Sequence, residues 1–118
     1  MDLIDNFLRF LGIQNILIVY FNYADLPAVH VLKKHYGLRA KVIKLEPEAN
    51  ILPPEASKYP LVIIIGPNTN PIIERLIKMR ALRKTSGIFA LGNTMVIVGK
   101  NPLETFELVS QFIRNGLH

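Results

Sequence analysis

The chain has no cysteine and no tryptophan, and only three of its 118 residues are histidines. Without cysteine it can form no disulfide framework, no thiol nucleophile and no zinc–thiolate site. The histidines are His30, His35 and His118. The first two share one predicted helix and lie about 140° apart around its axis, so they cannot chelate one ion. No serine stands at a strand-to-helix elbow either. We therefore expect no metal, no cofactor and no catalytic residue.

Long hydrophobic runs are also missing. The longest fully apolar runs, residues 16–21 and 61–65, are far shorter than the roughly 20 residues of a membrane-spanning helix. Asp2 and Asp5 stand near the N-terminus, where a secretion signal would carry positive charge. We therefore expect a cytoplasmic protein with no membrane partner.

The residues that are present describe a folded domain. Half of them are hydrophobic and 19% are charged, which excludes a disordered tail. A chain of this length buries about two-thirds of its unfolded surface, so we expect one domain over residues 1–118. The formal net charge of +5 makes a nucleic-acid partner conceivable without requiring one.

Helical and strand patterns alternate along the chain. The runs at residues 15–21 and 61–65 are continuously apolar, which is typical of central parallel strands covered on both faces. Lysines within residues 39–45 suit an edge strand. Gly92 and Asn93 predict a two-residue hairpin between strands at residues 87–91 and 94–98. Helices are expected from Asp2, Asp25, Asn70 and Asn101 onward, each capped by that residue.

These patterns predict an α/β fold: a three-layer αβα open sheet of the flavodoxin-like or Rossmann-like kind. The expected sheet has five strands in the order 2-1-3-5-4. It is mostly parallel, with the strand at residues 87–91 antiparallel at one edge.

In such a sheet, ligands bind beyond the carboxyl ends of the strands. The loops after the first, third and last strands should meet there, and two of them end in an Asn-Pro helix start that favours anions. One hypothesis is therefore a site for a small anionic ligand or nucleotide. Against it, no glycine-rich phosphate motif is present, and the asparagines and glycines also suit caps and turns. The candidate ligand-binding residues are Asn22, Asp25, Gly66, Asn68, Asn70, Gly99 and Lys100.

A basic cluster stands at the end of the third predicted helix. It can form a nucleic-acid-binding patch, or it can be a solvated helix end that complements the helix dipole. Its members are Arg75, Lys78, Arg80, Arg83 and Lys84.

The first predicted helix is apolar nearly all round. Leu3, Phe7 and Phe10 are therefore candidate interface residues, because self-association would cover them. Alternatively, the helix lies in a groove between another helix and the sheet.

Two segments resemble the α/β domain of archaeal surface-layer glycoproteins. In LVIIIGPNTNPIIERL, Gly66, Pro67 and Asn70 match a strand–Gly-Pro-x-x-Asn–helix motif, and in TMVIVGKNPLETFELVSQFI, Gly99 and Thr105 match a closing strand–Gly–helix segment. The match spans residues 60–113 loosely. The resemblance implies a non-enzymatic assembly module. The chain lacks that family's acidic surface, so we expect an intracellular relative from a heat-loving archaeon rather than a cell-surface protein.

The leading hypothesis is therefore a non-catalytic protein-interaction module that self-associates as a homodimer. Nucleic-acid binding through the basic cluster is the second hypothesis. Ligand binding at the strand ends is the third.

Overall fold

One five-stranded sheet forms the centre of the computed structural model, which describes residues 3–79 and 86–115. Its strand order is β2-β1-β3-β5-β4, and every neighbouring pair is parallel except the antiparallel pair of β4 and β5. The predicted α/β fold, strand order and antiparallel edge are confirmed. The strands are β1 (Ile16–Tyr20), β2 (Ala40–Lys44), β3 (Leu61–Gly66), β4 (Gly87–Leu91) and β5 (Thr94–Val98).

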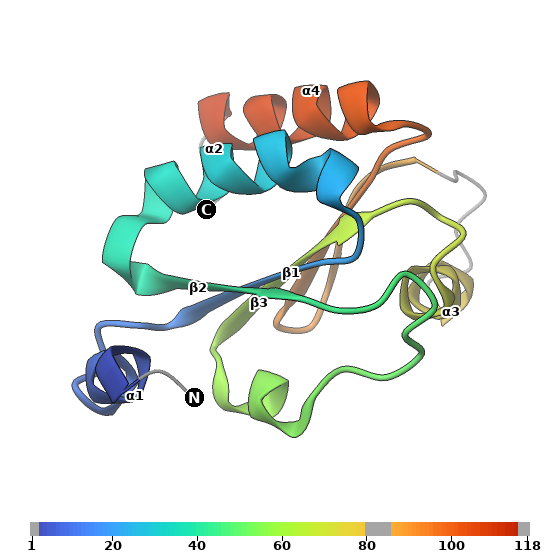
Figure 1. The fold of residues 1–118 in the computed structure, drawn as a ribbon. Coiled ribbons are helices and arrows are strands. Elements are labelled where there is room, and N and C mark those ends of the chain that lie inside the picture. The colour runs from blue at the N-terminus through green and yellow to red at the C-terminus, as the bar shows by residue number, and fades with distance from the viewer. Residues whose placement is uncertain (1–2, 80–85, 116–118) are drawn as a thin grey trace.

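The helices cover both faces of this sheet. Helices α2 and α4 lie side by side on one face, and α3 lies on the other (Figure 1). Helix α1 lies beyond the amino end of β1, away from the other three helices. No helix in the described ranges combines the length and the apolarity that crossing a bilayer requires. The helices are α1 (Leu3–Phe10), α2 (Leu26–Tyr36), α3 (Pro71–Met79) and α4 (Pro102–Arg114), with 3₁₀ turns η1 (Tyr23–Asp25), η2 (Gly37–Arg39) and η3 (Pro54–Lys58).

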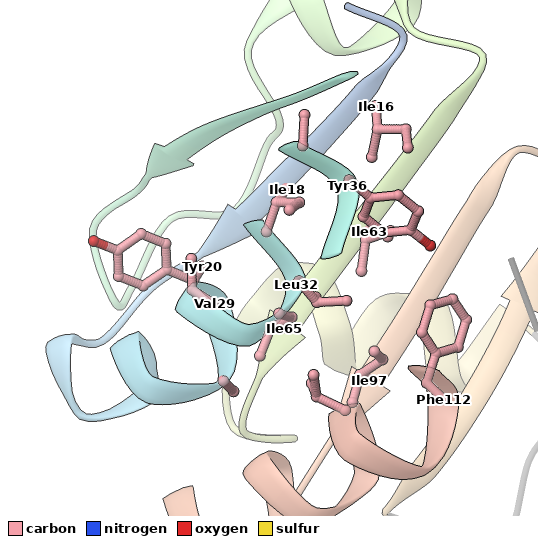
Figure 2. Packing of buried hydrophobic residues seen from close by; sticks show 13 residues of the cluster. Ile16, Ile18, Tyr20, Val29, Leu32, Tyr36, Ile63, Ile65, Ile97 and Phe112 are labelled. Atoms are coloured by element: carbon pink, nitrogen blue, oxygen red, sulfur yellow. The ribbon is translucent and has the colours of Figure 1, made fainter. Parts of the chain in front are cut away.

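The central strands are buried on both faces. Alternate residues of β1, such as Ile16 and Ile18, pack into the cluster under α2 and α4, which Figure 2 shows. The intervening residues Leu17 and Val19 pack into a second cluster, beneath α3 and η3. Because side chains alternate between the faces of a strand, a strand covered on both sides must be apolar throughout. This is the physical reason for the continuous apolar runs in the sequence.

The two edge strands of the sheet, β2 and β4, make different contacts with the rest of the chain. At β2, the Lys41 ammonium lies 3.1 Å from the Glu55 carboxylate, which fastens the loop after β2 across that edge. At the other edge, β4 turns into β5 through Gly92, whose φ of +61° favours glycine. The predicted hairpin is therefore present, with both strands at their expected residues.

Candidate functional site

A cleft of about 230 Å³ opens at the carboxyl edge of the sheet. Its walls come from the segments that follow β1, β3 and β5, which are the three loops expected to meet there. In open α/β sheets this edge is where ligands bind. The residues that line the cleft are Asn22, Ala24, Asp25, Pro67, Gly99, Lys100, Asn101, Pro102 and Thr105.

The wall after β5 is fixed by hydrogen bonds at the start of α4. Asn101 Oδ1 accepts from the backbone N–H of Glu104 at 2.9 Å, and Glu104 Oε1 accepts from the N–H of Lys100 at 2.9 Å. The Thr105 hydroxyl donates to the Asn101 carbonyl at 3.1 Å. Gly99 is required next to this turn, because a Cβ there would lie 2.9 Å from the Cα of Thr105. Asn101 therefore caps α4 as predicted, and the loop is held in one shape.

Asn70 has a structural task outside the cleft wall. Its Oδ1 accepts from the N–H groups of Ile72 and Ile73 at 2.9 and 3.2 Å, which caps α3 as predicted. Its Nδ2 donates to the carbonyls of Pro47 and Ala49 at 2.9 and 3.3 Å. Asn70 thus joins α3 to the loop after β2.

The other candidates after β3 do not line the cleft either. A Cβ at Gly66 would lie 2.9 Å from the Phe21 ring and 3.0 Å from Ile73, so this glycine allows α3 to pack on the sheet. Asn68 is half-buried and lies outside the cleft wall. Of the predicted ligand residues, the structure brings together Asn22, Asp25, Gly99 and Lys100.

The prediction that Asp25 caps α2 is wrong. Its side chain makes no capping hydrogen bond, and its backbone lies at φ −90° and ψ 0° instead of the extended conformation of a usual cap. The cause is η1, which brings the chain into α2 already turned. Asp25 is only 4% exposed, and no described residue forms a hydrogen bond or ion pair with its carboxylate. Burial raises the pKa of the Asp25 carboxyl above its ordinary value.

The described members of the basic cluster have partners within the chain. The Arg75 guanidinium donates to the Asn50 carbonyl. The Lys78 ammonium lies 2.8 Å from Glu74 Oε1, and this hydrogen bond, together with the lysine charge, lowers the pKa of the exposed Glu74 carboxyl. The other three members, Arg80, Arg83 and Lys84, lie outside the described residues. Nucleic-acid binding by this cluster stays a prediction.

Large hydrophobic side chains of α1 and the segment after it are exposed. Leu3 is 81% exposed, Phe7 60% and Phe10 85%. The alternative that α1 lies in a groove between another helix and the sheet is therefore wrong. We call these exposed residues the α1 surface, which consists of Leu3, Ile4, Phe7, Phe10, Leu11 and Ile13.

A few polar contacts attach α1 to the domain. The guanidinium of the half-buried Arg9 lies 3.9 Å from the Glu55 carboxylate. In the segment after α1, the Tyr59 hydroxyl donates to Gln14 Oε1 at 3.1 Å, and Gln14 is buried. These contacts lie beside the α1 surface and leave its apolar side chains at the protein exterior.

A second cavity, of about 250 Å³, lies at the amino edge of the sheet and was not expected from the sequence. Asn15, Tyr36 and Arg39 are among the residues that line it. Asn15 Oδ1 and the Tyr36 hydroxyl are buried there without a hydrogen-bond partner among the described residues. Burial raises the pKa of the Tyr36 hydroxyl, and the nearby Arg39 charge opposes that rise. The only sequence signal was a tyrosine in the last turn of a helix on its sheet-facing side.

Within the described ranges, no group of three or more histidine, aspartate or glutamate side chains is placed to hold a metal ion. The chain matches no protein-family model, no curated protein and no solved structure. The resemblance to surface-layer glycoproteins therefore stays a prediction.

Proposed function

We propose that this chain is a non-catalytic interaction module that forms a homodimer through the α1 surface. The observation that carries the proposal is the exposure of six large hydrophobic side chains within residues 3–13. Monomeric proteins rarely expose a contiguous apolar patch of this kind unless it binds something. The resemblance to a family of assembly proteins points the same way.

The size of the α1 surface fits a dimer interface. Its six side chains are 41–85% exposed and present on the order of several hundred Å², since one aromatic side chain alone can bury about 150–250 Å². A standard protein–protein interface buries about 800 Å² on each partner. Two copies that meet through this surface would therefore bury enough apolar area for a specific dimer.

The shape and charge of the surface also favour a second copy as the occupant. A two-fold axis pairs one patch with itself, so a single surface is sufficient. All six members of the α1 surface are uncharged, so burying these side chains removes no charge of their own from water. In addition, α1 has only eight residues, and isolated helices shorter than about 12 residues are marginal in water. Packing against a second copy supplies the tertiary contacts that stabilise it.

Sedimentation velocity over a concentration series tests the proposal. We expect a dimer with a Kd in the micromolar range or below, on the order of the affinities that interfaces of standard size show. The double variant Phe7→Ser, Phe10→Ser should be monomeric at every concentration. The matched control is Ile51→Ser, Leu103→Ser, which also replaces two exposed hydrophobic side chains but away from α1. This control should dimerise as the parent chain does.

Two results would contradict the proposal. One is a parent chain that stays monomeric well above that concentration. The other is loss of the dimer in the control variant but not in the α1 variant. A monomer that floats with phosphatidylserine vesicles, and loses this on Phe7→Ser, Phe10→Ser, would show instead that the α1 surface binds lipid.

A further inference from the structure

The Asp25 carboxylate is the unusual group of the cleft at the carboxyl edge. It is 4% exposed, lines the cleft and has no hydrogen-bond or ion-pair partner among the described residues. Buried carboxylates in proteins are ordinarily paired or hydrogen-bonded, because an unpaired buried charge is strongly unfavourable. It does not cap α2, so holding that helix does not explain its position. Because Asp25 lines the cleft, its unpaired carboxylate can accept hydrogen bonds from a ligand there.

The same edge is poorly suited to an anion. Helix N-termini bind anions through free backbone N–H groups. At α3 the Asn70 side chain already accepts from two of these groups, and at α4 the Asn101 side chain accepts from one. Pro71 and Pro102 have no N–H to offer at the first position of either helix. The Lys100 N–H is also used, because it donates to Glu104.

We propose that the cleft binds a small organic ammonium ion, with Asp25 accepting its N–H hydrogen bonds. A carboxylate and an ammonium group form a charge-assisted hydrogen bond, which is roughly twice as strong as a hydrogen bond between neutral groups. The volume of about 230 Å³ lies below the roughly 300–1,000 Å³ of pockets for drug-sized ligands, so the ligand is a molecule of a few heavy atoms. The neighbouring Asn22 amide supplies a further polar contact in the same wall.

Lys100 determines the orientation of such a ligand. Of the residues that line the cleft, Asp25 and Lys100 are the two titratable ones, and Lys100 is exposed whereas Asp25 is buried. The ammonium end therefore enters toward Asp25, and a carboxylate or hydroxyl at the other end faces Lys100 at the rim. This site does not depend on the proposed dimer, because α1 lies at the opposite, amino edge of the sheet (Figure 1).

Amide NMR titrations at neutral pH and constant ionic strength test the site, with ethylammonium chloride as the probe and potassium chloride as the ionic control. We expect saturable shifts at Ala24, Asp25, Gly99 and Lys100 in the millimolar range. Asp25→Asn should weaken the binding at least tenfold. Glu107→Gln, which removes an exposed carboxylate from α4, should bind as the parent chain does. The spectra also show that each variant is folded.

A second measurement separates this site from a nonspecific contact. Bound ammonium stabilises the ionised carboxylate, so ethylammonium should lower the pKa of Asp25 measured from its carboxyl carbon, and potassium should not. Equal binding by Asp25→Asn, or an unchanged pKa of Asp25 at saturation, would overturn the proposal. So would saturable binding of inorganic phosphate with none of ethylammonium, because the site would then be the anion site of the third sequence hypothesis.

Discussion

At the scale of single residues, Asp25 differs most from its sequence-based interpretation. An aspartate at a helix start ordinarily accepts a hydrogen bond from the first turn. Here the 3₁₀ turn η1 ends at Asp25, directly before α2, and the buried carboxylate makes no such hydrogen bond. The sequence could place Asp25 at the strand end but could not show its burial, because burial depends on distant segments such as α4, which packs against η1.

Replacing Asp25 by asparagine should stabilise the protein at neutral pH by about 1–3 kcal/mol, because asparagine keeps the size and polarity of the side chain but removes the charge that burial disfavours. The folded pKa of Asp25 is raised, so between its ordinary value of 3.8 and the folded value the folded state binds more protons than the unfolded state. The free energy of unfolding contributed by Asp25 therefore falls as pH rises through this window and levels off above it.

Urea denaturation as a function of pH measures this effect. The gain in the free energy of unfolding from Asp25→Asn should be absent below the ordinary pKa of Asp25. It should reach its full size above the pKa that Asp25 has in the folded protein. An advantage independent of pH would mean that the carboxylate is solvated in the folded protein.

Gly99 is a second residue whose importance is local and steric. A Cβ at this position would overlap the Thr105 hydroxyl and crowd the Thr105 backbone. Gly99→Ala should therefore cost about 3 kcal/mol, the upper end for overpacking. The comparison is Gly92→Ala, where a Cβ meets nothing and the positive φ alone costs about 1–2 kcal/mol. Thermal denaturation of both variants checks this order, and equal losses would show that α4 moves to admit the methyl group.

At the scale of elements, the two asparagine caps should contribute differently to the stability of the protein. Asn101 only caps α4, at an exposed position. Asn70 caps α3 and also holds the loop after β2, and the residue is only 2% exposed. Asn101→Ala should cost about 1 kcal/mol, the usual loss for a cap. Asn70→Ala should cost about 2–4 kcal/mol, because several buried backbone groups lose their partner.

Denaturant titrations of these two variants give the comparison directly. The Asn70 variant should also expose the loop at residues 45–53 to proteolysis, whereas the Asn101 variant should not. Equal stability losses would indicate that the hydrogen bonds from Asn70 to this loop contribute little.

At the scale of the whole molecule, the proposed dimer links stability to concentration. A dimer is favoured by mass action, so the Tm of the parent chain should rise with protein concentration. The variant Phe7→Ser, Phe10→Ser should have a Tm independent of concentration. Differential scanning calorimetry over a wide concentration range checks both expectations.

Salt gives a second test at this scale. Each copy carries a formal net charge of +5, so two copies repel each other. Raising the salt from about 0.1 M to about 1 M shortens the Debye length from about 10 Å to about 3 Å. Self-association should therefore strengthen with salt, whereas binding to nucleic acid would weaken. A dimer that dissociates at high salt would argue for a charged interface instead of the α1 surface.

The sequence by itself determined the fold and the place of the cleft. The apolar runs of β1 and β3 require cover on both faces, and the lysines of β2 favour an edge, so the strand order could be predicted. Hydrophobic periodicity and turn-forming residues are local properties, so they can be recognised in short stretches of consecutive residues. The capping of α3 and α4 could be predicted for the same reason.

Only the tertiary structure decided which of the candidate groups are buried and which stay exposed. The burial of Asp25, the exposure of the α1 surface and the cavity at Asn15 and Tyr36 all depend on what other segments cover. Desolvation is set by neighbours distant in the sequence, and a single sequence pattern does not encode it. Both proposed binding functions therefore depend on burial or exposure, at Asp25 and at the α1 surface, that is set only when the chain folds.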